Sequence, residues 1–328
     1  MQKLSIVVPV YYNAPTLPVL YEEFVRVMKI LDDVEGEFIF VDDASGDSSA
    51  RILSDLASAD NRVKLVQLSK NHGSGIAVFA GLSYATGDCA VIISADLQDP
   101  PSLIVELFRG WKEGFPAVLA VRSSRKDPWP TKVMASLFYR LMRRFGVKNI
   151  PEGGCDFGLI DRKIITAILQ MEEKNSHLII QVLWTGFDRK LIPYERRARV
   201  HGKSKWSIAK KLKLFIDSFT AFSYFPLRLV SSLGFTIAAL GLIYALFIIG
   251  LRLVHGVVIE GWSSLMVVVL IASGAQLIGL GIIGEYLWRV LDEVRKRPIF
   301  LVKRTIGFDA DCGAAVSIGS AATRASHV

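Results

Sequence analysis

The chain has 328 residues, enough for one large domain or two, and its 39 Lys and Arg outnumber its 31 Asp and Glu, for a formal net charge of +8. Residues 4–10 are too short for the apolar core of a signal peptide and lack a cleavage site, so we expect no signal peptide there. Cys89, Cys155 and Cys312 show no metal-ligand spacing, which indicates a reducing compartment.

From the N-terminus, hydrophobic periodicity predicts alternating strands and helices. The expected strands are 4–10, 37–41, 63–68, 89–94 and 117–121, and the expected helices are 16–31, 48–59, 75–85 and 101–113. This alternation predicts an α/β domain whose mostly parallel sheet is covered by helices on both faces. Ligands bind beyond the carboxyl ends of such strands. Polar clusters follow the strands there, at 11–13, 42–45, 71–73 and 94–99.

The glycine-rich segment NHGSG, residues 71–75, has two open interpretations. It lacks the Lys-Ser/Thr of a phosphate-binding loop, so it is a tight turn before a helix or a ligand contact. No Gly-x-Gly-x-x-Gly follows the first strand, which argues against a dinucleotide-dependent dehydrogenase.

The C-terminal part predicts a membrane protein. Two stretches, 229–251 and 262–284, contain no charged residue, and at about 1.5 Å per helical residue each is long enough to cross a bilayer core of about 30 Å. The alternative is a pair of helices buried in a soluble core. Lys and Arg are dense before the first stretch and after the second. The positive-inside rule therefore places both chain ends in the cytoplasm, most simply at a bacterial inner or plasma membrane.

Residues 204–225 carry an apolar stripe at helical spacing beside several lysines, which predicts an amphipathic helix in the membrane interface. An ordinary surface helix is the alternative. The expected organisation is a domain over 1–203, an amphipathic region over 204–228, a two-helix transmembrane hairpin over 229–284, and a basic segment with a disordered tail over 285–328. We assign the positive charge to the membrane surface and expect no nucleic-acid partner.

Six motifs occur in a fixed order along the chain. They are VVPVYYN (7–13), VDDASGDS (41–48), NHGSGIAVFAGLSYATGD (71–88), ADLQDPP (95–101), CDFGLIDR (155–162) and RVHGKSKW (199–206). With the hairpin after them, the chain over about 3–304 resembles the inverting polyprenyl-phosphate glycosyltransferases of glycosyltransferase family 2, which have the GT-A fold and include dolichol-phosphate mannose synthase and the bactoprenol glucosyltransferases.

The resemblance implies an enzyme that moves one sugar from a nucleotide-sugar to a polyprenyl phosphate with inversion, for a cell-envelope glycan or a glycoprotein. A UDP-sugar is favoured over a GDP-sugar. The alternative is a membrane scaffold subunit that binds nucleotide-sugar without catalysis. Small residues in the second stretch leave room for close helix packing within one chain or in a homo-oligomer.

The resemblance also implies a metal site for Mg²⁺ or Mn²⁺. Ser94, Asp96 and Gln98 match the family's Asp-x-Asp-x-Gln pattern, with Ser94 as a departure. Mg²⁺ keeps several waters and needs only one or two carboxylates, so one carboxylate, one amide and the donor phosphates suffice. Asp99 is expected to cap the helix that starts at Pro101.

For the nucleotide-sugar, the matching positions are Pro9, Tyr11, Asn13, Asp42, Asp43, Asn71 and Ala95. An acid of the Asp42–Asp43 pair is expected at the nucleobase or ribose, and a turn Asp that satisfies its own backbone is the alternative. Ala14 stands where relatives usually have Glu, which departs from the pattern for base or ribose recognition.

For the acceptor phosphate, the matching positions are Arg122, Lys132, Ser136, Arg199, Ser204 and Lys205. Asp156 matches the family's catalytic carboxylate, and Asp96 is counted with it. A phosphomonoester has a second pKa near 6, so it is largely dianionic at neutral pH and needs little deprotonation. Asp156 is therefore a general base, a positioning group, or a stabiliser of charge at the sugar C1. Asp161 pairs with Arg162 or caps the following helix.

Overall fold

The computed structural model describes residues 1–123, 140, 155, 157–171, 178–197, 225–255 and 261–308. The chain divides into two compact units. The first unit combines Met1–Ser218 with Pro298–Val328, and the second is Phe219–Arg297. The first unit is therefore discontinuous in sequence, because the chain leaves it and later returns.

The described residues of the first unit form an eight-stranded sheet in the order β7-β5-β6-β4-β1-β2-β3-β8. The strands are β1 Gln2–Val10, β2 Val34–Asp42, β3 Val63–Leu68, β4 Cys89–Ile92, β5 Ala117–Arg122, β6 Phe157–Asp161, β7 Arg189–Tyr194 and β8 Val302–Ile306. The pairs β1–β2, β1–β4, β2–β3 and β5–β7 are parallel. Strand β6 runs antiparallel to β4 and β5, and β8 runs antiparallel to β3. The predicted mostly parallel sheet is confirmed.

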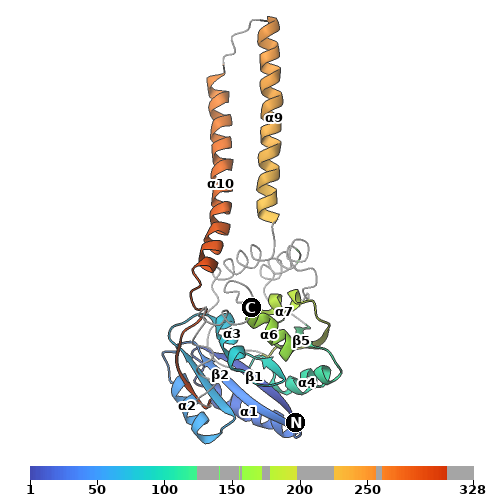
Figure 1. The fold of residues 1–328 in the computed structure, drawn as a ribbon, viewed down its shortest axis with the longest axis vertical. Coiled ribbons are helices and arrows are strands. Elements are labelled where there is room, and N and C mark those ends of the chain that lie inside the picture. Colours follow the sequence, from blue (N-terminus) through green and yellow to red (C-terminus); the bar gives the residue numbers. More distant parts are fainter. Residues whose placement is uncertain are drawn as a thin grey trace, which may run out of the picture. The chain divides into compact units, whose positions relative to one another are not determined.

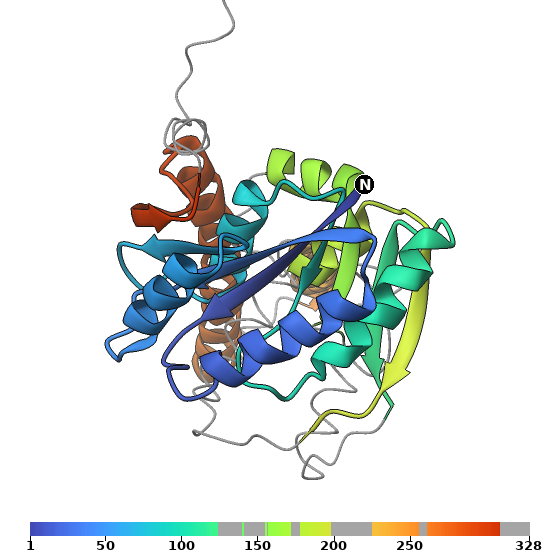
Figure 2. The same cartoon turned by 90° about the horizontal axis from the view of Figure 1, so that it is seen from below.

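Helices cover both faces of this sheet, as Figure 1 and Figure 2 show. They are α1 Leu17–Ile30, α2 Ser49–Ala59, α3 Ser74–Tyr84, α4 Ile104–Lys112 after a 3-10 turn at Pro101–Leu103, α6 Arg162–Met171 and α7 Leu178–Trp184. Helix α1 buries Leu17, Leu20 and Phe24, one stripe at helical spacing, against alternate residues of β1 and β2 such as Ile6 and Phe38.

Helix α3 covers the opposite face at close range. A Cβ built on Gly81 would overlap the Cγ1 of Val7 and lie 3.0 Å from the Cγ2 of Val41. Val7 and Val41 are fully buried and alternate along their strands with the residues that face α1. Glycine at this position therefore lets the α3 backbone approach the sheet.

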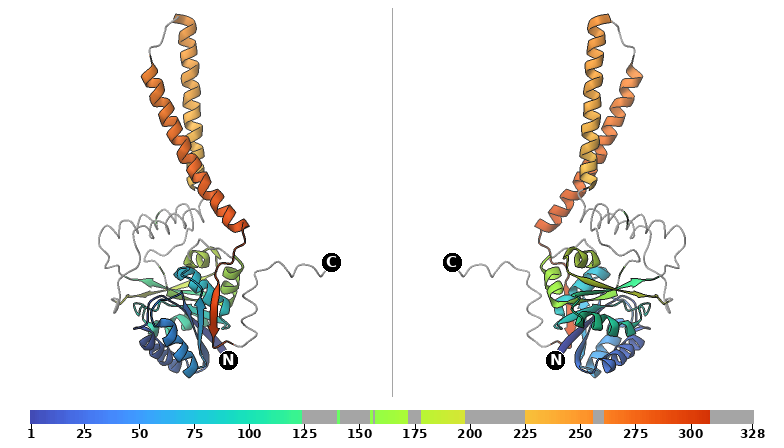
Figure 3. Two further views of the ribbon diagram at one scale, coloured as in Figure 1. Left: turned by 90° about the vertical axis from the view of Figure 1, so that its left-hand side faces the viewer. Right: turned by 90° about the vertical axis from the view of Figure 1, so that its right-hand side faces the viewer.

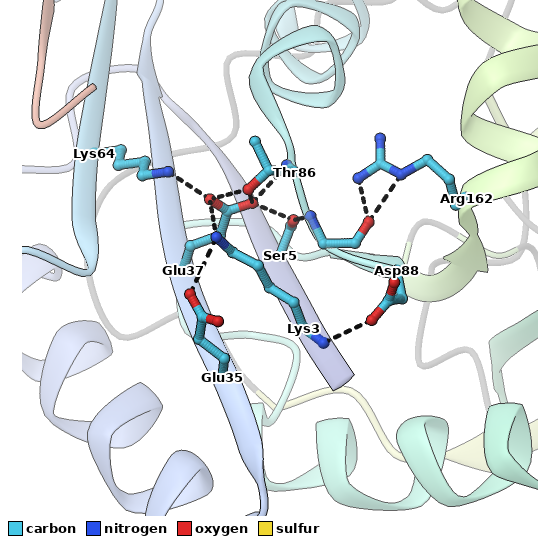
Figure 4. A network of polar contacts seen from close by, with 9 residues as sticks. Lys3, Ser5, Glu35, Glu37, Lys64, Thr86, Asp88 and Arg162 are labelled. Carbon is cyan, nitrogen blue, oxygen red and sulfur yellow. Dashed lines mark hydrogen bonds and ion pairs between the residues drawn. The ribbon is translucent and has the colours of Figure 1, made fainter. Parts of the chain in front are cut away.

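A buried carboxylate joins the strands at the amino edge of the sheet (Figure 4). Glu37 is 2% exposed and accepts hydrogen bonds from the Ser5 hydroxyl at 2.5 Å, the Lys64 ammonium at 2.6 Å and the Thr86 backbone at 2.7 Å. Burial acts to raise the pKa of Glu37, but these hydrogen bonds outweigh it and leave the pKa below the ordinary value. The Glu37 network thus ties β1, β2 and β3 to the loop that precedes β4.

The C-terminal strand β8 is not predicted from the sequence. Residues 302–306 fall in the segment expected to be basic, where no strand is predicted, and they pair with β3 at the edge of the sheet (Figure 3). The apolar Val302 and Ile306 are partly buried, while Lys303 and Arg304 between them are more exposed. The return of the chain therefore completes the first unit.

The second unit contains two long helices, α9 Phe225–His255 and α10 Trp262–Val294. The stretches 229–251 and 262–284 lie within them, so their helical character is confirmed. Among the residues that the structure describes, no helix combines the length and the apolar character required of a membrane span. The region 204–224, where most of the amphipathic helix is expected, and the tail from residue 309 lie outside the described residues.

Candidate donor site at the carboxyl edge of the sheet

The predicted donor residues gather at one edge of the sheet. In the parallel register, Val10 lies beside Asp42 and Asp42 lies beside Gln67, so the loops after β1, β2 and β3 leave the same edge. Strand β4 ends at this edge as well, since Val7 of β1 pairs with Ile92. The predicted nucleotide-binding residues lie at this edge or in the loops that follow it: Pro9, Tyr11, Asn13, Asp42, Asp43, Asn71 and Ala95.

The backbone at this edge is strained. Tyr12, Ala44 and Leu97 have φ angles of 58°, 56° and 58°, in the left-handed region that non-glycine residues rarely enter. Each follows a different strand, β1, β2 or β4. Such conformations cost about 1–3 kcal/mol each and persist where the surroundings hold them, which is common at functional sites.

Side chains hold the turn that follows β1. The Asn13 side-chain oxygen accepts a hydrogen bond from the Tyr11 backbone at 3.0 Å, and the Ser45 hydroxyl accepts one from the Tyr12 backbone at 3.0 Å. The Tyr11 and Tyr12 rings pack edge to face, with their ring centroids 4.7 Å apart. Tyr11 is 38% exposed and Tyr12 is 46% exposed. Exposed aromatic rings at a sheet edge offer an apolar surface on which a nucleobase can stack.

Asp42 and Asp43 are both buried, at 0% and 2% exposure. The Asp42 carboxylate accepts hydrogen bonds from the Ser45 backbone at 3.2 Å and the Gln67 amide at 3.1 Å. The Asp43 carboxylate accepts them from the backbones of His72 and Gly73, at 2.7 and 2.8 Å. Burial raises the pKa of Asp43 in spite of these hydrogen bonds. Both acids therefore order loops at this edge.

The second interpretation of Asp42, a turn residue that accepts from its own loop, agrees with this geometry. The glycine-rich segment is a turn before α3, as one interpretation had it: Gly73 has a φ of 95° and α3 starts at Ser74. Asp43 fixes that turn through the two backbone donors.

The loop after β4 brings two carboxylates together around one hydroxyl. The Ser94 hydroxyl lies 2.6 Å from an oxygen of Asp96 and 3.3 Å from an oxygen of Asp99. The Gln98 backbone donates to the same Asp96 oxygen at 3.2 Å. Hydrogen bonds to a carboxylate are shorter and stronger than neutral ones, so Ser94 and the Gln98 backbone hold the Asp96 side chain in place.

The prediction that Asp99 caps the next helix is wrong. The residue at the cap position is Pro100, and no side chain caps this 3-10 turn. Asp99 is instead 1% exposed and accepts a hydrogen bond from the Tyr194 hydroxyl at 2.6 Å, with the Arg196 guanidinium at 3.4 Å. Burial raises the pKa of Asp99. A buried carboxylate needs polar partners, and here they come from the last residue of β7 and from the segment that follows it.

Tyr194 and Arg196 are site residues that the motifs do not reveal. Arg196 lies 3.9 Å from Asp96 as well as beside Asp99. Burial raises the pKa of both Asp99 and Tyr194, and the positive charge of Arg122, which is predicted at the acceptor phosphate, partly offsets this rise, so Arg122 lies beside the same cluster. The only sequence signal for Arg196 is its place in the arginine-rich stretch RRAR, residues 196–199.

The cluster fits a divalent cation only if other ligands complete the site. Among the described residues, no group of three or more His, Cys, Asp or Glu side chains can hold a metal ion. Asp96 supplies one partly exposed carboxylate, and Ser94 and Gln98 supply a hydroxyl and an amide in the same loop. Mg²⁺ and Mn²⁺ prefer oxygen ligands, and Mg²⁺ is commonly bound through one or two carboxylates plus substrate phosphates.

The remaining predicted site residues lie outside the described part of the chain: Lys132, Ser136, Asp156, Arg199, Ser204 and Lys205. Asp156 directly precedes Phe157, the first residue of β6. Asp161, at the end of β6, accepts a hydrogen bond from the Lys163 backbone at 3.0 Å, so its capping role at α6 is confirmed. Arg162 instead donates to the Gly87 carbonyl at 2.8 Å.

Comparisons with known proteins show what the chain is similar to. A family model described as glycosyl transferase family 2 matches residues 5–169. The Uncharacterized glycosyltransferase YkcC of Bacillus subtilis (strain 168) is 40% identical over 93% of this chain and 94% of its own. The SfII prophage-derived bactoprenol glucosyl transferase of Shigella flexneri is 36% identical over 92% of this chain and 98% of its own. A solved structure of glucosyl-3-phosphoglycerate synthase from Mycobacterium tuberculosis with UDP is 18% identical, covering 67% of this chain and 79% of that one, at a TM-score of 0.46.

Proposed function

Because the chain belongs to glycosyl transferase family 2, we propose that it transfers one sugar from a UDP-sugar, or secondarily a GDP-sugar, to a polyprenyl phosphate with inversion. A relative named bactoprenol glucosyl transferase supports this acceptor class. Its similarity extends over 92% of the chain, well beyond the residues 5–169 that define the family. The similarity therefore includes much of the chain after residue 169, where Arg199, Ser204, Lys205 and the two long helices lie.

The observation that carries the proposal is the Ser94–Asp96–Asp99 cluster at the carboxyl edge of the sheet, the edge at which the exposed Tyr11 also follows β1. The departing group is a nucleoside diphosphate, whose growing negative charge requires a nearby positive charge. Asp96 would hold Mg²⁺ or Mn²⁺ with Ser94 and Gln98, and the cation, when bound, would neutralise the diphosphate. Tyr11 would stack on the nucleobase, with Pro9, Asn13, Asn71 and Ala95 around it.

The acceptor needs positioning more than activation. Its phosphate is largely dianionic at neutral pH, so an oxygen can attack the sugar C1 in a single displacement without first losing a proton. Arg122 would bind this phosphate, because it already lies beside the acidic cluster. Lys132, Ser136, Arg199, Ser204 and Lys205 complete the proposed acceptor site, and Asp156 would orient the acceptor or stabilise charge at C1.

We also propose that residues 229–251 and 262–284 cross the membrane as a hairpin, with residues 204–228 in the interface and both chain ends on the cytoplasmic side. Support comes from the 31- and 33-residue helices that contain these stretches. Large apolar side chains on both are more than half exposed, among them Leu240, Ile243 and Leu277. Exposed apolar surface of this extent requires a lipid or protein partner.

Turnover by the purified full-length chain in detergent tests the proposal. The acceptor is a short polyprenyl phosphate, the donors are a panel of UDP- and GDP-sugars, and each reaction is run with and without Mg²⁺ or Mn²⁺. We expect metal-dependent release of one nucleotide, reduced about a hundredfold or more by Asp96→Ala. Asp55→Ala, on the exposed face of α2, is the matched control and should leave the rate unchanged.

Nucleotide-sugar binding without turnover would contradict the enzymatic proposal. That result would favour the alternative, a non-catalytic scaffold subunit. Ser94 departs from the family pattern and leaves Asp96 as the one matching carboxylate. The comparison of turnover with and without Mg²⁺ or Mn²⁺ therefore decides whether one carboxylate supports metal-dependent catalysis.

A further inference from the structure

A row of polar side chains crosses three strands of the sheet at its carboxyl edge. Asp42 of β2 lies beside Gln67 of β3, and Gln67 lies beside Arg304 of β8. The Arg304 guanidinium donates to the Gln67 side-chain oxygen at 2.8 Å, and the Gln67 amide donates to Asp42 at 3.1 Å. A cation on one side and a carboxylate on the other fix the orientation of the Gln67 amide.

The row continues into the proposed donor loops. Asp42 accepts a hydrogen bond from the Ser45 backbone at 3.2 Å, and the Ser45 hydroxyl accepts one from the Tyr12 backbone at 3.0 Å. Four hydrogen bonds therefore connect Arg304, in the last described strand, to the turn beside Tyr11. Two of the residues on or next to this path, Tyr12 and Ala44, have left-handed backbones that need such support.

The row has a buried carboxylate at one end and an exposed guanidinium at the other. Asp42 is 0% exposed and Gln67 is 9% exposed. A buried carboxylate is stabilised when its donors are themselves polarised by a positive charge, because a chain of hydrogen bonds strengthens each member. Arg304 supplies that positive charge, so removing it would weaken the hydrogen bond from the Gln67 amide to Asp42.

The strand geometry places Arg304 for this contact. The register between β3 and β8 shifts at Gln67 and Leu68, since Gln67 pairs with Arg304 but Leu68 pairs with Val302. Lys303 is the extra residue of this bulge. A bulge increases the local twist and redirects side chains, and bulges are common next to active sites.

We propose that Arg304 is a positioning residue for the nucleotide-sugar: through Gln67 and Asp42 it fixes the loop at Ser45 and the turn at Tyr12. A strand that follows the two long helices would then be part of the donor site, although it lies far outside residues 5–169. The proposal rests on the proposed function, because it assumes that this edge binds the donor.

The test uses the full-length chain in detergent with four single variants and one double variant. Arg304→Ala and Gln67→Met break the row, Arg304→Lys keeps a charged donor, and Lys303→Ala changes the neighbouring residue of the same strand as a control. We expect the first two to weaken nucleotide-sugar binding and raise KM about tenfold, with kcat changed less than about twofold. Arg304→Lys should recover part of the loss, and the Arg304→Ala/Gln67→Met double variant should be no worse than either single variant.

Amide hydrogen exchange provides a readout that does not depend on the donor. The Tyr12 and Ser45 amides both donate within the row, so Arg304→Ala should speed their exchange about tenfold and Lys303→Ala should not. Exchange and KM equal to those of Lys303→Ala would overturn the proposal. If Arg304→Ala lowered the melting temperature but changed neither KM nor exchange at these two amides, Arg304 would contribute to stability alone, and the proposal would be overturned as well.

The two proposals fail in different ways. If the wild-type chain binds no nucleotide-sugar, the proposed function fails, while faster exchange at Tyr12 and Ser45 in Arg304→Ala still supports the link from β8 to this edge. If the wild-type chain binds donor and Arg304→Ala binds it equally well, the role of Arg304 fails and the proposed function stands.

Discussion

Ser94 places a hydroxyl between the two carboxylates of the acidic cluster. Its hydroxyl lies within hydrogen-bonding distance of Asp96 and Asp99, and burial already raises the pKa of Asp99. We predict that Ser94→Asp lowers the free energy of unfolding by about 1–3 kcal/mol in EDTA, because it removes a donor to a carboxylate and adds a like charge. Thermal unfolding with and without Mn²⁺ measures the effect.

A divalent cation should reverse that loss. A ligand at 100 times its dissociation constant stabilises the folded state by about 2.7 kcal/mol, so Mn²⁺ should raise the melting temperature of Ser94→Asp more than that of the wild type. Ser94→Ala removes the same hydroxyl without adding charge and should show no such gain. Equal responses of both variants to Mn²⁺ would argue against a cation at this loop.

Glu37 is a buried carboxylate that stabilises the amino edge of the sheet, opposite the candidate donor site. We predict that Glu37→Gln lowers the free energy of unfolding by about 3–5 kcal/mol at pH 7, because it leaves the Lys64 ammonium and the Ser5 and Thr86 donors without their carboxylate. Glu35→Gln, at a position whose side chain is 61% exposed, should change it by less than about 0.5 kcal/mol. Urea denaturation of both variants measures the difference.

The pH dependence of this effect follows from the pKa of Glu37. The folded state holds that pKa below the ordinary value of 4.5, so the stabilisation is complete above pH 4.5 and is lost as the pH falls through the folded pKa. The gap between wild type and Glu37→Gln should therefore narrow in acid. A gap that stays constant from pH 7 to pH 3 would mean that the charge of Glu37 does not contribute.

At the scale of elements, the packing of α3 on the sheet depends on Gly81. We predict that Gly81→Ala lowers the free energy of unfolding by about 1–3 kcal/mol, because the new methyl group would overlap Val7 and press on Val41. Gly75→Ala, in the first turn of the same helix, meets no atom within 4 Å and should stabilise by about 0.5–1 kcal/mol. If both variants shifted the urea midpoint in the same direction, close packing would not explain Gly81.

The first half of the sheet could be predicted because its signals are local. Strands 63–68 and 117–121 and the helices between them appear in the structure within a few residues of the expected bounds. Strands β6 and β7 are not among the expected strands, and β7 gives a weak signal because it contains Pro193 and is mostly only partly buried. Strand β8 was not expected, because its basic residues resemble a membrane-flanking segment and its partner β3 lies far back in the chain.

The candidate site could likewise be predicted only where its sequence signals are local. Strand ends placed Asp42, Asp43 and Asp96 at one edge, since parallel strands expose their carboxyl ends together. The partners of Asp99 could not be predicted, because Tyr194 and Arg196 come from a strand and a loop about a hundred residues later. Buried polar groups take partners that only the tertiary fold brings to them.

At the scale of the whole molecule, the first unit is built from two separate pieces of chain. We predict that a variant in which a flexible linker of about 20 residues, with a mean span of about 25 Å, replaces 219–297 keeps the first unit folded. A chain that stops at Ser218 lacks β8, exposes the edge of β3 and should melt at least about 5 °C lower or aggregate. Circular dichroism and light scattering compare the two. Equal melting temperatures would show that β8 does not contribute to the unit.

The linker variant also separates donor chemistry from access to lipid. If residues 219–297 serve to hold the enzyme at a bilayer, the variant should bind nucleotide-sugar as the full-length chain does and transfer sugar to a short, water-soluble polyprenyl phosphate in buffer without detergent. It should lose about a hundredfold or more of its activity on a long polyprenyl phosphate embedded in vesicles, because the acceptor is then confined to a surface that the variant does not occupy. Equal activity on both acceptors would contradict a membrane role for α9 and α10, and would leave their exposed apolar surface to a protein partner.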